Sequence, residues 1–175
     1  MIPRQPLPRR WLMTDERLGD RLFEAIGRLP EDGGIVFRHY GSADRRALFE
    51  RVAQAARKRR ILLLLAGPAE EAEAWGADGS HGRGPGAGLR TAPAHDLAEI
   101  RAAEGAGAAA LFLSPVFATR SHPEAPVLGP ERFAELASQT RLPVIALGGM
   151  DEGRYVLLTG AYGWAGIDAW SSSPS

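Results

Sequence analysis

The chain has 175 residues, of which 45% are hydrophobic and 24% are charged, values typical of one folded globular domain. Its 21 basic residues balance 21 acidic residues, so the charge does not point to nucleic acid or a membrane surface as a partner. Cysteine is absent, which excludes disulfides, thiolate metal sites and a thiol nucleophile and favours a cytoplasmic protein.

Eight short apolar runs alternate with longer amphipathic stretches along the chain, a pattern typical of βα units around a parallel sheet. The run at residues 61–65 has no polar alternation, as expected for a strand that is covered on both faces. The predicted strands are 11–14, 34–38, 61–65, 77–80, 89–92, 109–113, 143–147 and 163–167.

Four of the amphipathic stretches follow residues that commonly start a helix. These residues are Asp15, Ser42, the pair His95 and Asp96, and Pro130. The corresponding predicted helices are 21–28, 45–59, 97–104 and 131–138.

Eight strands with interleaved helices predict a single, compact (β/α)8 TIM barrel over residues 11–170. Residues 1–10 have no apolar run of signal-peptide length and are expected to form a flexible lead-in, and residues 171–175 a C-terminal tail. The glycine-rich stretch 82–88 is a poor helix former and few residues remain at the end, so we expect helices 4 and 8 to be reduced or missing. An open doubly wound sheet is the alternative architecture.

A glycine pair follows the seventh predicted strand. Gly148 and Gly149 allow the backbone to approach a ligand and to point N–H groups at an anion, and the loops after strands 7 and 8 of such barrels often bind phosphate. Asp168 would lie in the second half of this site, where its carboxylate would repel phosphate unless only its amide takes part. A turn that needs glycine only for its tight geometry is the alternative.

Residues 114–122 follow the sixth predicted strand and lead into a proline-rich loop that ends at Pro130. A loop of this length after a barrel strand is commonly a substrate lid, and an ordinary surface loop is the alternative. Within it, Thr119 is a candidate phosphate-binding residue.

All four histidines follow predicted strands, at the end of the barrel where catalysis occurs in this fold. They are His39, His81, His95 and His122. The last three are candidate catalytic residues, because imidazole exchanges protons near neutral pH. Helix capping or chance would also explain some of these placements, and the spacing matches no metal-site motif.

Arg38 leaves the second predicted strand at the same end of the barrel. Its guanidinium is suited to hold phosphate oxygens through two parallel hydrogen bonds, and a salt bridge to a carboxylate at the rim is the alternative. The only lysine, Lys58, is expected at a solvated helix end rather than in Schiff-base chemistry.

Five segments, in order, resemble the thiamine phosphate synthase and thiazole tautomerase family. They are WLMTD at 11–15, GGIVFR at 33–38, WGADGSH at 75–81, SPVFAT at 114–119 and LPVIALGGM at 142–150. The resemblance implies a barrel in which a thiazole phosphate lies on the turn of Gly148 and Gly149 and on backbone amides near Ile167 and Asp168. In the synthases, a pyrimidine pyrophosphate loses pyrophosphate, and the thiazole nitrogen captures the carbocation-like species. Magnesium and basic side chains stabilise the departing charge.

The chain departs from the family pattern around the expected metal site. The family's Asn-Asp pair after strand 3 is replaced by Ala66 and Gly67, and residues 82–88 contain no carboxylate where an aspartate is expected. Magnesium is therefore the cofactor that the family implies, but its carboxylate ligands are missing, and we assign no metal ligand.

Further departures affect substrate and acid–base positions. Only Arg38 remains of a Gln-x-Arg-x-Lys arrangement, with Val36 and Tyr40 at the other two positions. Pro93 takes the place of a serine, His122 that of a lysine, and Pro115 that of the tautomerase histidine.

We therefore expect a divergent thiamine phosphate synthase-like protein that binds a small phosphorylated heterocycle and couples it to a pyrimidine pyrophosphate. A non-catalytic ligand-binding or regulatory barrel is the alternative, and a different phosphorylated substrate is a third possibility. A homodimer is considered, because a missing helix 8 would leave one flank of the barrel open.

Overall fold

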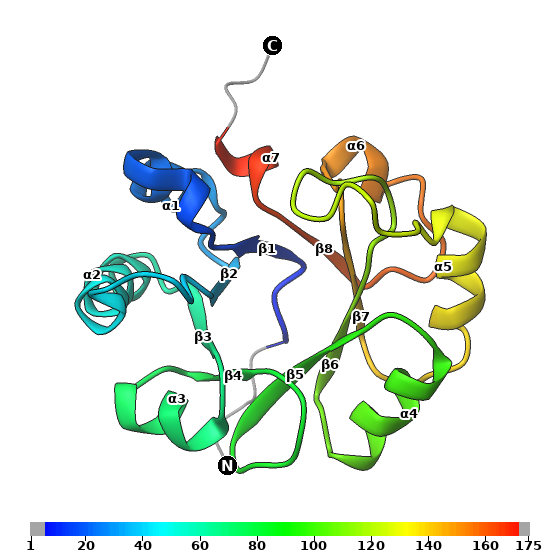
Figure 1. Cartoon of the computed structure of the whole chain (residues 1–175), viewed down its shortest axis with the longest axis horizontal. Helices are drawn as coiled ribbons and strands as arrows, with labels where there is room; N and C mark the ends of the chain where they lie inside the picture. The colour runs from blue at the N-terminus through cyan, green and yellow to red at the C-terminus, as the bar shows by residue number, and fades with distance from the viewer. Residues whose placement is uncertain (1–5, 172–175) are drawn as a thin grey trace.

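The computed structural model describes residues 6–171 and shows eight parallel strands that close into a barrel in chain order (Figure 1). Strand β1 pairs with β2 on one side and with β8 on the other, which closes the ring and excludes the open sheet. Each predicted strand overlaps an observed one. The strands are β1 (Arg10–Met13), β2 (Gly34–Phe37), β3 (Leu62–Ala66), β4 (Gly79–His81), β5 (Leu89–Ala94), β6 (Ala110–Leu113), β7 (Val144–Leu147) and β8 (Gly163–Gly166). The predicted TIM barrel is confirmed.

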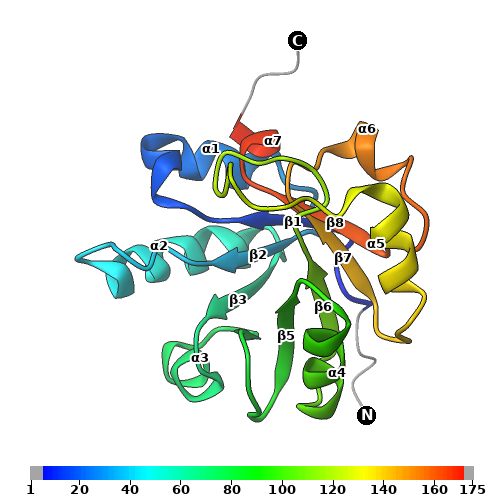
Figure 2. The same ribbon diagram turned by 45° about the vertical axis from the view of Figure 1, so that its right-hand side comes forward.

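Helices surround the strands on the outside (Figures 1 and 2). They are the 3-10 helix η1 (Glu16–Arg21), α1 (Leu22–Arg28), α2 (Arg45–Lys58), α3 (Ala69–Trp75), α4 (Leu97–Gly105), α5 (Gly129–Ala137), α6 (Glu152–Tyr155) and α7 (Asp168–Ser171). The four predicted helices are present as α1, α2, α4 and α5, and η1, α3 and α6 are additions. Asp15 and Asp96 cap η1 and α4 through their side chains. The N-cap residue of α2 is Asp44 and not Ser42, and the Asp44 side chain makes no capping hydrogen bond.

The two expected reductions are both confirmed. Residues 82–88 connect β4 directly to β5 by an irregular, bent segment, because this stretch has too many glycines to hold a helix. After β8, α7 has only four described residues. Of the proposed lead-in and tail, residues 1–5 and 172–175 lie outside the described residues, while Arg10 belongs to β1 and Ser171 to α7.

Aromatic side chains fill the barrel interior and join it to the outer layer. Trp11 on β1 meets the ring of Phe112 on β6 at 5.3 Å in an edge-to-face contact across the interior. Gly34 makes room for Trp11, since a Cβ there would lie 2.3 Å from the indole ring. Outside, Phe49 of α2 contacts Phe37 of β2 at 5.5 Å. The predicted buried strands thus have apolar cover on both sides.

Two tryptophans cover the flank where a longer helix 8 would pack. Trp164 of β8 and Trp170 of α7 stack with ring centroids 4.9 Å apart and an interplanar angle of 1°. The Trp170 indole N–H donates to the Trp11 carbonyl oxygen at 2.9 Å, and the Trp164 indole N–H donates to Glu152 at 2.9 Å. Both tryptophans are nearly inaccessible, at 2% and 8% exposure.

We therefore expect Trp170→Ala to lower the free energy of unfolding by about 3–5 kcal/mol, the usual cost of truncating a large buried aromatic side chain. Trp170→Phe keeps an aromatic ring but loses the indole hydrogen bond, and should cost only about 1–2 kcal/mol. Urea denaturation followed by tryptophan fluorescence and circular dichroism measures both changes. A Trp170→Ala loss below about 1 kcal/mol would show that the stack does not seal the barrel.

Candidate functional site

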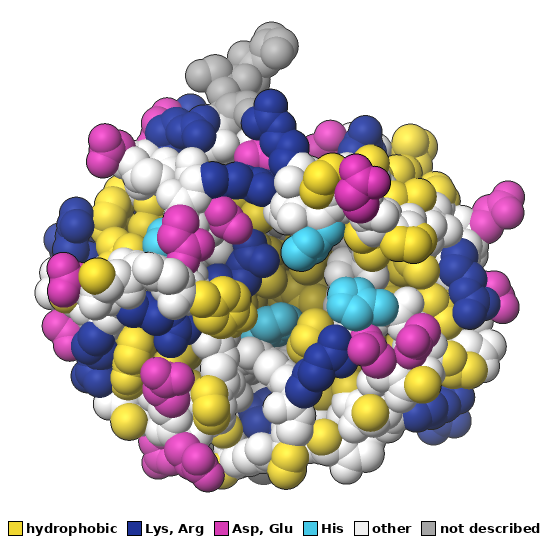
Figure 3. All heavy atoms as spheres, in the orientation of Figure 1, with side chains coloured by type: hydrophobic (Ala, Val, Ile, Leu, Met, Phe, Trp, Pro, Cys, Tyr) yellow, Lys and Arg dark blue, Asp and Glu magenta, His cyan; other side chains and the backbone are white. Residues whose placement is uncertain are grey.

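The carboxyl ends of the strands form one face of the barrel. On this face, histidine and basic side chains gather around a central hollow (Figure 3). Of the functional residues predicted from sequence, His81 is the last residue of β4, and the others belong to the segments that follow β2, β5, β6, β7 and β8. They therefore share one face, although their surroundings differ.

The turn of Gly148 and Gly149 packs closely against the segment after β6. Their φ angles are +102° and +60°, in the left-handed region that favours glycine. A Cβ on Gly148 would lie 2.8 Å from Cα of Pro115, and one on Gly149 would lie 2.6 Å from the carbonyl oxygen of Ala118. The Phe117 amide also donates to the Gly148 carbonyl oxygen at 3.0 Å. This packing by itself requires glycine at both positions, as the tight-turn interpretation stated.

The segment between β6 and α5 is held at its base by backbone hydrogen bonds and is exposed at its tip. Leu128 and Gly129 donate their amides to the carbonyl oxygens of Pro115 and Val116, both at 2.9 Å. Within the loop, the Thr119 hydroxyl accepts from the Ser121 amide at 3.3 Å. His122 is exposed near the tip of the same loop. Thr119 and His122 thus lie on one connected segment at the rim of the mouth.

Arg38 is held by groups that follow β1. Its Nε donates to the Thr14 carbonyl oxygen at 2.9 Å, and its Nη2 lies 3.3 Å from Oδ2 of Asp15. Burial lowers the pKa of Arg38 from its ordinary value, an effect that the charge of Asp15 opposes. The alternative of a salt bridge to a rim carboxylate is therefore present in the structure.

A second arginine at the mouth escaped the sequence prediction. Arg17 donates from Nη1 to the Ser121 hydroxyl at 2.9 Å and from Nη2 to Asp168 at 3.1 Å. It thereby joins the segments after β1, β6 and β8. Its place in η1, shortly after the end of β1, was the available signal, but its partners come from far along the chain.

The histidines occupy four different environments. His39 has a φ angle of +38°, stacks on Phe37 and lies with Nδ1 3.0 Å from the Thr14 hydroxyl. Nδ1 of His95 lies 2.8 Å from the Ser114 carbonyl oxygen, to which it donates. Each of these two is fixed by a neighbouring group.

His81 lies inside the barrel mouth. Its Nδ1 is 2.9 Å from the Thr91 hydroxyl, and its ring meets Phe112 edge-on at 4.8 Å. Burial, together with the smaller effect of the nearby positive charge of Arg38, lowers the pKa of His81 to about 3. The ring is therefore neutral at physiological pH, which suits a hydrogen-bonding group better than a general base.

The structure does not fit the magnesium that the family resemblance implies. Arg45 donates from Nη2 to the Ala66 carbonyl oxygen at 2.8 Å and lies 3.6 Å from Glu71, so a guanidinium contacts the segment that replaces the family's Asn-Asp pair after β3. Among residues 6–171, no three histidine, aspartate or glutamate side chains are grouped closely enough to hold a metal ion. We derive no reaction step through a metal.

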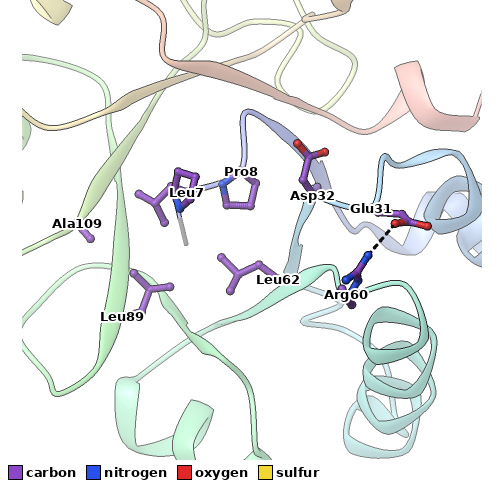
Figure 4. A pocket seen from close by; sticks show the side chains of 10 residues that line it. Leu7, Pro8, Glu31, Asp32, Arg60, Leu62, Leu89 and Ala109 are labelled. Carbon is purple, nitrogen blue, oxygen red and sulfur yellow. Dashed lines mark hydrogen bonds and ion pairs between the residues drawn. The ribbon is translucent and has the colours of Figure 1, made fainter. Parts of the chain in front are cut away.

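A cavity of about 890 Å³ lies at the opposite end of the barrel (Figure 4). Its lining is mainly apolar, and its charged pair Glu31 and Arg60 is highly exposed. The lining residues precede or begin strands, and that end of such barrels serves stability rather than catalysis. Size alone therefore does not mark this cavity as the functional site.

Comparison with known proteins agrees with the fold and the order of the site segments. The family model described as thiamine monophosphate synthase matches residues 91–170. A protein assigned as thiamine-phosphate synthase 2 of Aquifex aeolicus is 32% identical over 92% of this chain and 96% of its own length. The chain belongs to the thiamine-phosphate synthase family.

Other relatives of this family member point the same way. A thiamine-phosphate synthase of Geobacillus thermodenitrificans is 31% identical over 82% of this chain and 75% of its own length. The structure of a thiamine phosphate pyrophosphorylase from Pyrococcus furiosus superposes with a TM-score of 0.78, at 26% identity, over 95% of this chain and 89% of that one. The resemblance stated from the sequence is confirmed, and these relatives support a role in thiamine biosynthesis rather than the non-catalytic alternative.

The low pKa of His81 predicts a specific pH dependence of stability. The folded-state pKa of about 3 lies below the ordinary value of 6.5, so the unfolded chain binds one more proton between these values. The stabilisation is complete above pH 6.5 and is lost as the pH falls towards 3. This group contributes a slope of up to about 1.4 kcal/mol per pH unit.

The measurement is urea denaturation of the wild type and of His81→Gln at several pH values between 4 and 7. We expect the wild type to lose stability more steeply with falling pH than the variant. Parallel curves would contradict the low pKa of this histidine.

Proposed function

We propose that this family member binds a thiazole phosphate at the carboxyl end of its barrel and couples it to a pyrimidine pyrophosphate. The observation that carries the proposal is the place of Gly148 and Gly149 in a chain that belongs to the family. The adjoining turn after β8 supports it, since a Cβ on Gly166 would lie 3.3 Å from the Met150 carbonyl oxygen. The end of β8 at Gly166 therefore adjoins the glycine turn after β7, as a phosphate site formed by the loops after strands 7 and 8 requires.

In the proposed reaction, the bond between the pyrimidine methylene carbon and the pyrophosphate oxygen breaks, and its electron pair leaves with pyrophosphate. The thiazole nitrogen then forms the new bond to that carbon. No proton has to be removed from the thiazole nitrogen, because it attacks through its lone pair. The main task of the protein is therefore to orient the two rings and to stabilise the departing charge.

Arg38 is the residue that we assign to the pyrophosphate. Its guanidinium lies at the mouth, is partly buried and already faces one carboxylate, Asp15. Because Ala66 and Gly67 replace the family's Asn-Asp pair and residues 82–88 contain no carboxylate, arginine charge has a larger part in this proposal than the family pattern implies. Thr119 and His122, on the loop after β6, are proposed to contact the substrates when this loop covers the mouth.

His81 and His95 have different parts in the proposal. The neutral ring of His81 is suited to hydrogen-bond an uncharged part of the ligand inside the mouth. His95 keeps the acid–base role proposed from sequence, and its Nδ1 contact with the Ser114 carbonyl oxygen would orient the ring for it.

A coupling assay tests the reaction directly. Purified protein receives thiazole phosphate and pyrimidine pyrophosphate, with and without magnesium, and thiamine phosphate is measured by fluorescence after oxidation to thiochrome. Turnover supports the synthase, and binding of thiazole phosphate by calorimetry without turnover supports the ligand-binding alternative. Absence of both would contradict the proposed function.

The variant Gly149→Ala tests the phosphate seat. A methyl group at φ +60° would meet the Ala118 carbonyl oxygen and Phe117, which displaces the turn from the ligand. We expect affinity for thiazole phosphate to fall about tenfold or more, the size of losing hydrogen bonds to a charged group. Gly153→Ala is the matched control, because its Cβ would meet nothing closer than 3.4 Å and its affinity should be unchanged. Equal affinity of the two variants for thiazole phosphate would show that this turn does not bind the phosphate.

Two further expectations belong to the proposal. We place the reaction in the cytoplasm, because phosphorylated heterocycles carry charge and do not cross a bilayer unaided. No helix among residues 6–171 is long and apolar enough to cross a membrane.

A homodimer is supported by Val156 and Leu157, which are 70% and 80% exposed, and light scattering would test it.

A further inference from the structure

Arg17 joins three loops at the mouth of the barrel. One guanidinium nitrogen donates to Ser121 on the loop after β6, and another donates to Asp168 at 3.1 Å. The Arg17 side chain is 28% exposed and that of Asp168 is 45% exposed, so the pair lies at the edge of the mouth and not in the core. A ligand entering the mouth therefore has access to this pair.

Each of two arginines at the mouth faces a carboxylate. Arg17 faces Asp168, and Arg38 faces Asp15. The two guanidiniums are close enough that the positive charge of Arg17 contributes to lowering the pKa of Arg38. A phosphate group that entered this region would meet two arginines, but both are already paired with carboxylates.

Arg17 is also incompletely satisfied. Its Nε is buried and has no hydrogen-bond partner among the residues that the structure describes. A buried donor without a partner is unfavourable, so a rearrangement of the guanidinium that gave Nε an acceptor would be stabilising. The ion pair with Asp168 therefore leaves part of the guanidinium unused.

Asp168 occupies a position that conflicts with the proposed ligand. It lies two residues after β8, in the segment proposed to hold the phosphate together with the turn of Gly148 and Gly149. Carboxylate and phosphate repel each other unless a cation lies between them. Arg17 is a cation that contacts Asp168, so its guanidinium can reduce the repulsion between this carboxylate and a phosphate.

We propose that Arg17 is an additional phosphate-binding residue, and that Asp168 holds its guanidinium until the phosphate monoester of the substrate takes the place of the carboxylate. This inference rests on the proposed function and names the group that binds the phosphate charge. Phosphate suits the exchange better than a carboxylate ligand, because it carries up to two charges and offers several acceptor oxygens to the planar guanidinium. The contact with Ser121 would place the loop after β6 over the same ligand.

Two charge-removing variants test the exchange, and they should act in opposite directions. Arg17→Gln removes the phosphate contact, so affinity for thiazole phosphate should fall about tenfold to a hundredfold. Asp168→Asn removes the competing carboxylate, so affinity should rise about threefold to tenfold. Calorimetry with thiazole phosphate and with the unphosphorylated thiazole alcohol measures both changes, and binding of the alcohol should not change.

Matched controls come from the opposite end of the barrel. Arg60 and Glu31 form an exposed pair with a separation of 3.3 Å, and Arg60→Gln and Glu31→Gln alter the net charge by the same amounts. Neither should change the affinity by more than about twofold. Thermal unfolding of every variant shows whether the fold is intact.

The outcomes separate this inference from the proposed function. If Arg17→Gln and Asp168→Asn both weaken binding, the pair is a structural clamp and the exchange is wrong. If the wild type does not bind thiazole phosphate, the proposed function fails, and the four variants are compared with inorganic phosphate instead. Opposite effects there would still support the exchange, and absence of phosphate binding by every variant would overturn it.

Discussion

The pairing of β1 with β8 is the constraint on which the rest of the structure depends. These strands lie at opposite ends of the described chain, and the register Trp11 to Ala165 brings them together. Closure places the segment after β1 beside the segment after β8, which is why Arg17 and Asp168 meet although 151 positions separate them. It also sets Trp11 opposite Phe112 inside the ring. Without the pairing of β1 with β8, the barrel would have neither a filled interior nor a closed ring of loops at its mouth.

Much of the fold could be predicted from the sequence, because the patterns that mark its strands and helices are local. Apolar runs such as Leu62–Ala66 identify strands covered on both faces, and the glycines of residues 82–88 show where a helix cannot form. Helix α3 was not among the predicted helices, because only seven residues lie between its capping Pro68 and Gly76. Boundaries moved by one or two residues, as at β4, where tertiary pairing rather than composition sets the ends.

The site was only partly readable, because its contacts join distant segments. The sequence placed the histidines at one end of the barrel but gave no sign that His81 is enclosed against Phe112 and Thr91. It identified the glycine turn, but the steric reason for Gly148 lies in Pro115, on a neighbouring strand end. The roles of charged residues were hardest to predict, since a guanidinium such as that of Arg45 can satisfy backbone carbonyls instead of binding a ligand.

The short segment α7 has a consequence for how the barrel is completed during synthesis. Trp170 covers Trp164 and bonds to the carbonyl oxygen of Trp11, so the first strand lacks its second neighbour until β8 and α7 have left the ribosome. Contacts over such sequence separations form slowly, because a long loop must close before they contribute. During that interval the edge of β1 is exposed to pairing with other chains. The barrel can therefore close only after synthesis has passed β8.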